Sequence, residues 1–311
     1  MTFGSYTNFP FNCCNTNELI DINNSDRYIL IDTPKTDLPN LIITEEAIIV
    51  SNLNPIDNDG EIIPSNLSSC KYYSCHDYQK LNSDKNNIKN ISIFHNNFNG
   101  LESKFDQFHN FLINTSSDID IIAITETSQH VNNIKFKTNV ELKGYTLFST
   151  ASNTSKGGCA IYIKNKFNVN ERMDLNIIND HYESIWIEIK NKSSKNVIVG
   201  CIYRHPHDNI EIYNNFSEYL EPILSKLNNE NKEIYLCGDF NSDILKIDYN
   251  NSYKRFYELT SSYGLAPFIL LPTRIKGDSA TIVDNIFTNN RTNKIENFIK
   301  VQSTCNKVQI V

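Results

Sequence analysis

The side chains best suited to chemistry follow an apolar run late in the chain. In "IYLCGDFN", residues 234–241, the run leads directly to Asp239, Phe240 and Asn241. Successive side chains of a strand alternate between its faces, so Asp239 and Asn241 share one face while Phe240 packs on the other. Burying a carboxylate and an amide without partners costs several kcal/mol. We therefore expect hydrogen-bond partners at a polar sheet edge, the alternative being an ordinary strand-ending turn.

Other polar side chains also stand where apolar runs end. They are Asn97 after "ISIFHN", Glu126 after "IIAIT", Tyr203 and Arg204 after "VGCI", and Asp284 within "TIVDNIF". Each alone has a simpler explanation: a helix cap for Asn97, a surface acid for Glu126 and a turn former for Asp284. Together they supply the oxygen ligands that Mg²⁺ prefers, with amide donors and a phenol. Phosphodiester hydrolysis needs such a metal ion, and a group that activates water.

The elements that must position these residues are short strands in runs, interrupted by a few helices. Strands are expected at 91–97, 118–127, 144–151, 157–165, 183–191, 196–204, 233–241 and 280–290, and helices at 101–112, 214–230 and 252–264. The helices show apolar residues at helical spacing, and the strands are alternating or continuously apolar. This pattern favours two packed sheets with helices outside them. Residues 1–88 contain only short apolar pieces and are interpreted as an N-terminal extension, partly disordered, before a domain at 89–311.

Composition excludes few functions, but it predicts where in the cell the protein acts. A net charge of −7 does not by itself predict a nucleic-acid binder. Local basic clusters do allow DNA binding, and Arg204, Thr273 and Arg274 in "YRHPH" and "PTRIKG" are the candidate contacts. The sequence has no basic start followed by a long apolar run, and no apolar run of roughly 20 residues. We expect an intracellular protein, neither secreted nor membrane-spanning, and nuclear when it acts on DNA. Three cysteines, at 159, 201 and 237, lie inside apolar runs and are predicted to be core residues.

Six motifs in order give the chain a resemblance to a known superfamily. They are "NFNGL" at 97–101, "AITET" at 123–127, "GCIYRHP" at 200–206, "GDFN" at 238–241, "PTR" at 272–274 and "TIVDNIFTN" at 281–289. In this order they resemble the endonuclease/exonuclease/phosphatase superfamily. The resemblance is greatest to the apurinic/apyrimidinic-type endonuclease domain of non-LTR (LINE-like) retrotransposons, which also has segments similar to "GGCAIYIK" and "ESIWIEI".

The resemblance implies an α/β fold, a four-layered sandwich of two packed, mostly antiparallel sheets flanked by helices. It also implies a DNA endonuclease that depends on Mg²⁺, with Mn²⁺ as a possible substitute. Asn97 and Glu126 would then help to hold the metal ion. Tyr203 would lie beside the scissile phosphate, Asp239 would align or activate the attacking water, and Asn241 would bind the developing oxyanion. Asp284 would orient a catalytic histidine.

The last motif departs from the family. Where the family has Ser-Asp-His, this chain has Cys305, Asn306 and Lys307, and it contains no histidine after His207. Asn306 would stand in place of the metal-supporting aspartate and Lys307 in place of the histidine. A lysine does not exchange protons near neutral pH without a large depression of its pKa. We therefore expect strongly reduced activity, and two alternatives remain: a non-catalytic remnant that binds DNA or protein, or another phosphatase or phosphodiesterase of the superfamily.

Overall fold

This computed structural model describes residues 91–290, apart from 115–118, 153, 155, 193, 207–209 and 277–278, together with the backbone of five short strands outside that range. Those strands are β1 (Leu19–Asp21), β2 (Tyr28–Leu30), β3 (Lys71–Tyr73), β17 (Phe298–Lys300) and β18 (Gln309–Ile310). Of residues 210, 212, 275 and 276 only the backbone is described.

The first large sheet carries the later half of the domain. Its order is β13 (Ala266–Pro267), β16 (Asp284–Thr288), β12 (Glu233–Asp239), β11 (Val197–Arg204), β10 (Tyr182–Ile189) and β8 (Val169–Glu171), with β9 (Ile177–Ile178) also paired to β10. Only the β11–β12 pair among these is parallel. A parallel pair needs a crossover, and α5 (Ile210–Asn229) provides it.

The second large sheet has the order β3, β17, β18, β4 (Ile93–Asn97), β5 (Ile121–Thr125), β7 (Cys159–Lys164) and β6 (Tyr145–Ser149). The parallel β4–β5 pair is connected through a 3₁₀ turn at Glu102–Lys104 and α3 (Phe105–Asn114). Its edge strand β3 comes from the segment interpreted as an extension, and it pairs in parallel with β17. The boundary at residue 88 stays a prediction.

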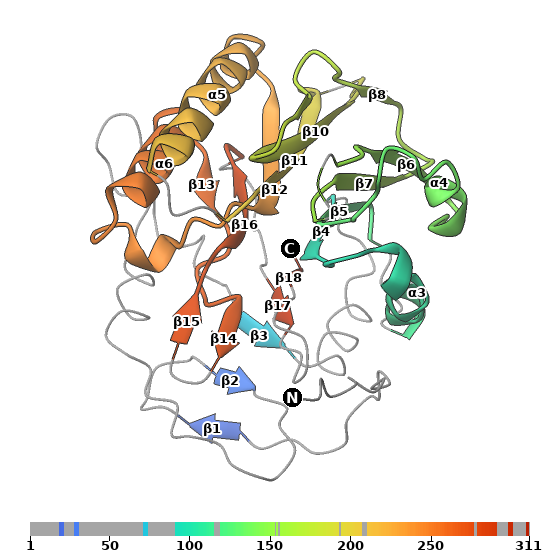
Figure 1. The fold of residues 1–311 in the computed structure, drawn as a ribbon, viewed down its shortest axis with the longest axis horizontal. Coiled ribbons are helices and arrows are strands. Elements are labelled where there is room, and N and C mark those ends of the chain that lie inside the picture. Colours follow the sequence, from blue (N-terminus) through green and yellow to red (C-terminus); the bar gives the residue numbers. More distant parts are fainter. Residues whose placement is uncertain are drawn as a thin grey trace, which may run out of the picture.

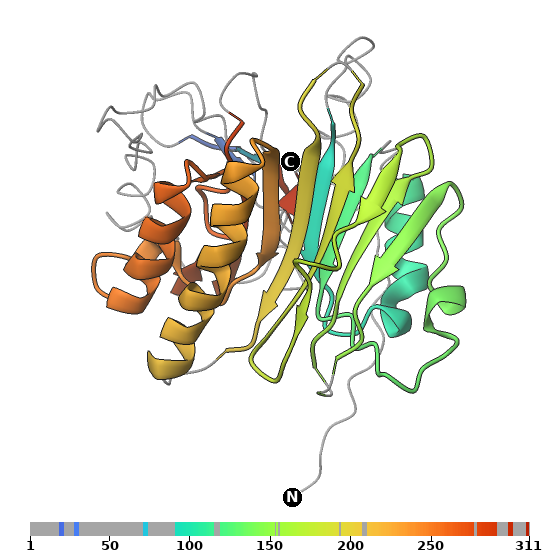
Figure 2. The ribbon, with the colours of Figure 1, turned by 90° about the horizontal axis from the view of Figure 1, so that it is seen from above.

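Helices cover both outer faces, which confirms the expected four-layered sandwich (Figures 1 and 2). α5 and α6 (Asn251–Ser262) pack on the first sheet. α3 and α4 (Phe136–Asn139) pack on the second. The remaining elements are the β1–β2 pair, a 3₁₀ turn at Ile244–Lys246, and a hairpin of β14 (Arg274–Lys276) and β15 (Ser279–Thr281).

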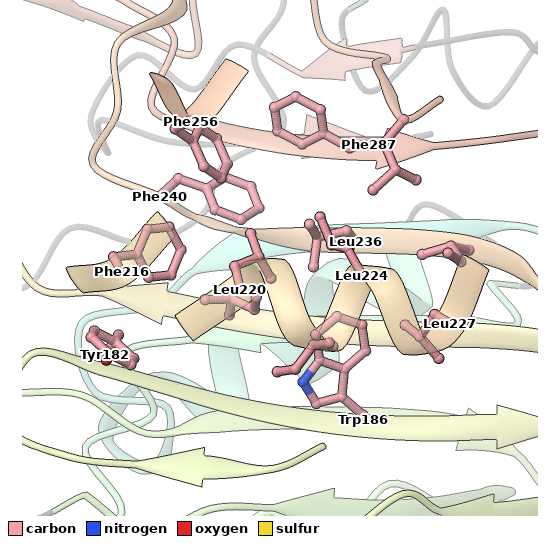
Figure 3. Packing of buried hydrophobic residues seen from close by; sticks show 14 of the residues in the cluster. Tyr182, Trp186, Phe216, Leu220, Leu224, Leu227, Leu236, Phe240, Phe256 and Phe287 are labelled. Carbon is pink, nitrogen blue, oxygen red and sulfur yellow. The ribbon is translucent and has the colours of Figure 1, made fainter. Parts of the chain in front are cut away.

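Alternation along the strands divides the core into layers. In β11, Val199 and Cys201 face the other sheet, while Ile198 and Ile202 face the helices. On the helix side, Trp186 lies under α5 among large apolar side chains (Figure 3). Gly200 makes room for it, because a Cβ at that position would lie 2.4 Å from the indole ring. The three cysteines predicted as core residues are fully buried between the sheets, as expected.

One expected strand is divided in two. The run 280–290 forms β15 and β16, with a break at Ile282 and Val283. The carbonyls of these two residues accept hydrogen bonds from Ile244 N (3.1 Å) and Phe240 N (2.9 Å). The break lets β15 pair with β14 while β16 pairs with β12, so Asp284 begins a new strand. No helix among the described residues is long and apolar enough to cross a membrane.

Candidate active site

The apolar layer between the two sheets becomes polar at one end. On β4 the side chains facing this layer are Ile93, then His95, then Asn97. In the first sheet, Tyr203 is the register partner of Asp239, which is also the partner of Asp284. Strand pairing thus places three of the predicted site residues in one row across β11, β12 and β16.

Asn97 connects this row to the second sheet. Its amide nitrogen donates to Asp239 Oδ2 at 2.5 Å and to Glu126 Oε1, the residue that follows β5. Its amide oxygen accepts from the backbone N of Asn99 at 3.2 Å. Asn97 is therefore not a helix cap. It is a buried donor between two carboxylates on different sheets, which brings together the residues that the sequence placed at separate strand ends.

The loops at this end have strained backbone. Glu126 has φ +52° and Asn241 has φ +44°, a left-handed conformation that few non-glycine residues adopt. Such strain persists where surrounding contacts hold it, and it gathers at functional sites. Asn241 is held by its side-chain amide, which donates to the carbonyl of Arg204 at 2.6 Å, and by its backbone N, which donates to Asp239 Oδ1 at 3.2 Å.

Arg274 bridges the two aspartates of the row. One of its terminal nitrogens (NH2) donates to Asp239 Oδ2 at 2.6 Å, and Nε donates to Asp284 Oδ2 at 3.3 Å. Burial by itself lowers the pKa of this guanidinium, but the charges of Asp284 and Asp239 outweigh burial and raise it. Both aspartates are almost fully buried. Arg274 thus supplies the positive charge that two buried carboxylates need. Its neighbour Thr273 is also buried, and its hydroxyl has no hydrogen-bond partner among the described residues.

Arg204, predicted to bind nucleic acid, has a different position from the one expected. It is 2% exposed, and its guanidinium donates to the carbonyls of Phe240 (2.6 Å) and Asn241 (2.5 Å). The guanidinium also lies 4.2 Å from the centre of the Tyr213 ring. Burial lowers its pKa, partly offset by Tyr213. Arg204 therefore braces the loop that follows Asp239, and its remaining terminal nitrogen donates to the carbonyl of His205 at 3.2 Å.

Tyr203 is buried beside two carboxylates. Burial raises the pKa of its hydroxyl, and the charges of Glu126 and Asp239 raise it further. The hydroxyl therefore stays protonated at neutral pH and is a donor, with the Glu126 carboxylate as a hydrogen-bond partner. Its ring packs edge-on against His205, with 4.6 Å between ring centroids.

Two polar residues of this region were missed by the sequence reasoning. Glu183 on β10 is fully buried, accepts from the hydroxyl of Ser152 and the backbone N of Gly158, and lies 3.8 Å from Nε2 of His205. Glu183 lies in the "ES" pair at 183–184 and Gly158 in the "GG" pair at 157–158. No local sequence pattern indicates that these two segments are in contact. His95 lies two residues before Asn97 on the same face, and the two-residue period of the strand could have identified it.

Lys307 and Asn306, proposed in place of the family's histidine and aspartate, lie outside the described residues, as does Cys305. No group of three or more His, Cys, Asp or Glu side chains among the described residues could hold a metal ion. Mg²⁺ sites in proteins commonly use only one or two carboxylates, completed by water and phosphate. The Glu126 carboxylate and the Asn97 amide oxygen are hard oxygen donors at adjacent strand ends. Their chemistry fits such an ion.

Comparison with known proteins gives a family and a fold. A profile described as the Endonuclease/Exonuclease/phosphatase family matches residues 87–296, more than half of the chain. The AP endonuclease LMAP from Leishmania major superposes with a TM-score of 0.60 at 12% identity, covering 86% of this chain and 98% of that chain. An AP endonuclease from Archaeoglobus fulgidus gives 0.52 at 14% identity, with 71% and 98% covered. At such identities the likeness shows the fold alone. No curated protein sequence matches significantly.

Proposed function

Because the chain belongs to the Endonuclease/Exonuclease/phosphatase family, we propose that it is a metal-dependent phosphodiester hydrolase whose substrate is DNA. The observation that carries the proposal is the polar end of the layer between the sheets. There Asn97 joins Glu126 of one sheet to Asp239 of the other, and Tyr203 and Asp284 flank Asp239 in register. A phosphodiester hydrolase needs oxygen ligands for a metal, a group to align water and donors for phosphate, and this cluster offers all three.

DNA as the substrate is supported by two likenesses. The solved structures that superpose on the chain include AP endonucleases. The motif order resembles the endonuclease domain of non-LTR retrotransposons, which nicks target DNA for reverse transcription. We assign this chain the same role, with action in the nucleus. Arg274, whose side chain is 26% exposed, and its buried neighbour Thr273 adjoin the cluster and are the proposed phosphate contacts.

Each side chain has a proposed task that follows from its contacts. Asp239 accepts from two donors on Oδ2, which fixes its carboxylate so that Oδ1 can align the attacking water. The protonated Tyr203 hydroxyl is a donor for the phosphate. The side-chain amide of Asn241, which donates to the Arg204 carbonyl in this structure, is the proposed donor for the developing oxyanion. Asp284 orients the basic side chain of the last motif, which is Lys307 in this chain.

Glu126 and Asn97 would hold Mg²⁺, or Mn²⁺ in its place, with Asn306 as a further oxygen donor. A metal ion bound there offsets the negative charge of the phosphate oxygens. Asn97 has a second task, because its amide nitrogen keeps the Glu126 and Asp239 carboxylates in place.

Lys307 limits the activity that we expect. A lysine neutralises phosphate charge but is a poor proton carrier near neutral pH. Loss of one catalytic group commonly lowers kcat by about 10²-fold or more, and groups that act as a unit are not additive. The proposal is therefore a DNA-nicking hydrolase with a strongly reduced rate.

Nicking of supercoiled plasmid by the purified chain tests this function. The parent and Asp239→Ala are compared in Mg²⁺, in Mn²⁺ and in chelator, and DNA binding is measured in parallel. Slow, metal-dependent nicking by the parent that Asp239→Ala abolishes is the expected result. Nicking that survives Asp239→Ala would contradict the proposal.

A second function is favoured by the sequence at 305–307, which lacks the family's aspartate and histidine. It is a non-catalytic domain that binds DNA. DNA binding by the parent without any metal-dependent cleavage, even at high enzyme concentration, would favour this alternative.

A further inference from the structure

The loop that follows Asn97 has an unusual backbone that the proposed mechanism does not explain. Asn99 has φ +48° and Gly100 has φ +99°, so two consecutive residues lie in the left-handed region. Glycine adopts this region readily, whereas an asparagine stays there when surrounding contacts hold it. The loop therefore needs partners that fix its shape.

The main chain of this loop is joined to the end of β5 and the residue after it. Phe98 N donates to the carbonyl of Thr125 at 3.0 Å, and Gly100 N donates to the carbonyl of Glu126 at 2.8 Å. The side chains of Asn97 and Glu126 are also hydrogen-bonded to each other. The two residues proposed to hold the metal ion are thus connected through both the side chains and the main chain.

The carbonyls of this loop have a charged partner. Nζ of Lys104, a half-buried residue just before α3, donates to the carbonyl of Phe98 at 2.5 Å and to that of Asn99 at 3.2 Å. An ammonium group has three donors, so it can bind two carbonyls at once. Hydrogen bonds from a charged donor are roughly twice as strong as neutral ones. Lys104 therefore fixes two successive peptide groups.

The opposite ends of these two peptide groups contact the proposed metal-holding residues. A peptide group is planar, so its C=O and N–H point in opposite directions and turn together. The carbonyl of Phe98 shares its plane with Asn99 N, which donates to Oδ1 of Asn97 at 3.2 Å. The carbonyl of Asn99 shares its plane with Gly100 N, which donates to Glu126. Lys104 thus holds one end of each peptide group, and Asn97 or Glu126 accepts at the other end.

Helix stability does not explain a lysine at this position. Lys104 lies where the 3₁₀ turn Glu102–Lys104 passes directly into α3. The first turn of a helix favours acidic side chains, and a positive charge there is unfavourable. The position of Lys104 is explained by the loop carbonyls that it binds.

We propose that Lys104 is a positioning residue for the metal-holding end of the site. It acts through the peptide groups on either side of Asn99 and is no ligand itself, because an ammonium group has no acceptor and repels a cation. An amide oxygen has two lone pairs. Asn99 N uses one of those on Asn97, and the orientation that Lys104 imposes directs the other. The consequence for metal binding rests on the proposed function, whereas the contact itself does not.

Amide signals test the contact without any need for activity. The full chain is labelled with ¹⁵N in its ten glycines, and the Gly100 signal is assigned by its loss in Gly100→Asn. Lys104→Met should shift the Gly100 signal more than that of any other glycine, and Lys104→Arg, which keeps the charge and the donors, should shift it less. Lys137→Met, at an exposed position of α4, is the matched control and should leave it unchanged. A Gly100 signal that does not respond to Lys104→Met would overturn the proposal.

Mn²⁺ binding then tests the consequence in the absence of DNA. The free ion is measured by electron paramagnetic resonance while it is titrated into the purified chain. Lys104→Met should weaken binding about 10- to 100-fold, the usual effect of removing a group that supports a ligand, and Lys104→Arg should recover part of the loss. Simple charge removal predicts the opposite sign, because loss of a nearby positive charge strengthens cation binding. Lys137→Met removes the same charge and should not weaken binding.

The outcomes separate the two proposals. If Lys104→Met weakens Mn²⁺ binding but the parent does not nick DNA, the inference stands and the proposed function fails. If the parent nicks and Lys104→Met folds and binds Mn²⁺ as tightly as the parent, Lys104 has only a structural role and the inference is wrong. A parent that binds no Mn²⁺ would contradict both. Thermal unfolding identifies a variant that fails to fold, and Lys104→Gln, which keeps a donor without the charge, then replaces Lys104→Met.

Discussion

Three nitrogen-bearing side chains organise the candidate site at the scale of single residues. Asn97 joins two carboxylates, Arg274 joins two carboxylates, and Arg204 holds the loop between Asp239 and Asn241. Each is mostly or fully buried and has several acceptors. The carboxylates keep their charge in the interior because these donors replace water.

Arg204→Met should destabilise the fold by about 2–5 kcal/mol, because it leaves the Phe240 and Asn241 carbonyls without their donor. Urea unfolding at neutral pH measures this. Arg255→Met is the matched control: the side chain of Arg255 is 45% exposed and pairs with Glu218, so its loss should cost about 1 kcal/mol or less. If Arg204→Met kept full stability and instead weakened salt-dependent DNA binding, the original expectation of a phosphate contact would be right.

Local pattern predicts some of these residues and not others. The strand-end positions of Asp239 and Glu126 follow from alternation and from the apolar runs before them. The inward direction of Arg204 does not, because it depends on the carbonyls of a loop on the next strand. The approach of His95 to Asp284 joins β4 to β16 across two sheets, and no local pattern contains that contact.

At the scale of elements, a buried acid on one sheet holds a turn on the other. Glu183 of β10 accepts from the backbone N of Gly158, ahead of β7. The carbonyls of Gly158 and Gly157 in turn accept from Thr127 N (3.2 Å) and Ser128 N (2.8 Å), immediately after Glu126. A Cβ on Gly157 would lie 2.6 Å from the Glu183 carboxylate, so the glycine lets the acid approach. The segments at 157–164 and 183–189 therefore meet behind the strained Glu126.

Glu183→Gln should loosen this arrangement while keeping its shape. We expect a loss of about 1–3 kcal/mol in unfolding free energy, since a charged acceptor is replaced by a neutral amide. Hydrogen exchange at the amides of Thr127, Ser128 and Gly158 should become faster. Glu188→Gln, on the same strand but far from the turn, is the control and should leave exchange at these three amides unchanged. Equal exchange in Glu183→Gln and the parent would show that Glu183 does not hold this turn.

The expected strand at 280–290 shows where element prediction stops. Its residues before Asp284 are apolar or β-branched, so the sequence predicts one strand. The break arises because the Ile282 and Val283 carbonyls accept hydrogen bonds from backbone N–H groups of the segment after β12. Those partners are distant in sequence, whereas the runs at 196–204 and 233–241 form their strands as predicted because burial on both faces suits their composition.

At the scale of the whole molecule, charge is concentrated at both ends of the sandwich. At the end of the strands away from the site, Asp120 lies 2.5 Å from Lys166 Nζ and 3.3 Å from Lys164 Nζ. Glu188 pairs there with Lys232 and Arg172. Burial alone raises the pKa of each acid, but the hydrogen bonds from Lys166 to Asp120 and from Lys232 to Glu188, together with the nearby charges, lower both pKa values.

These pairs predict a specific acid sensitivity. Because the folded-state pKa values lie below the ordinary values of 3.8 for Asp120 and 4.5 for Glu188, the stabilisation is present above those values. It is lost as the pH falls below them and through the folded-state pKa values. The Asp120→Asn, Glu188→Gln double variant should be less stable at neutral pH and should lose less unfolding free energy on acidification. Urea unfolding between pH 7 and about pH 3 measures both, and identical pH slopes in parent and variant would show that the pairs contribute nothing.

We propose that the fold presents a hydrolytic site that is complete except for its last motif. The most direct test is plasmid nicking in Mg²⁺ by the Asn306→Asp, Lys307→His double variant beside the parent, each with and without Asp239→Ala. We predict that the double variant nicks at least about 10²-fold faster than the parent and that Asp239→Ala abolishes the gain. A double variant that folds but nicks no faster than the parent, or a gain that survives Asp239→Ala, would show that the last motif is not what limits this site.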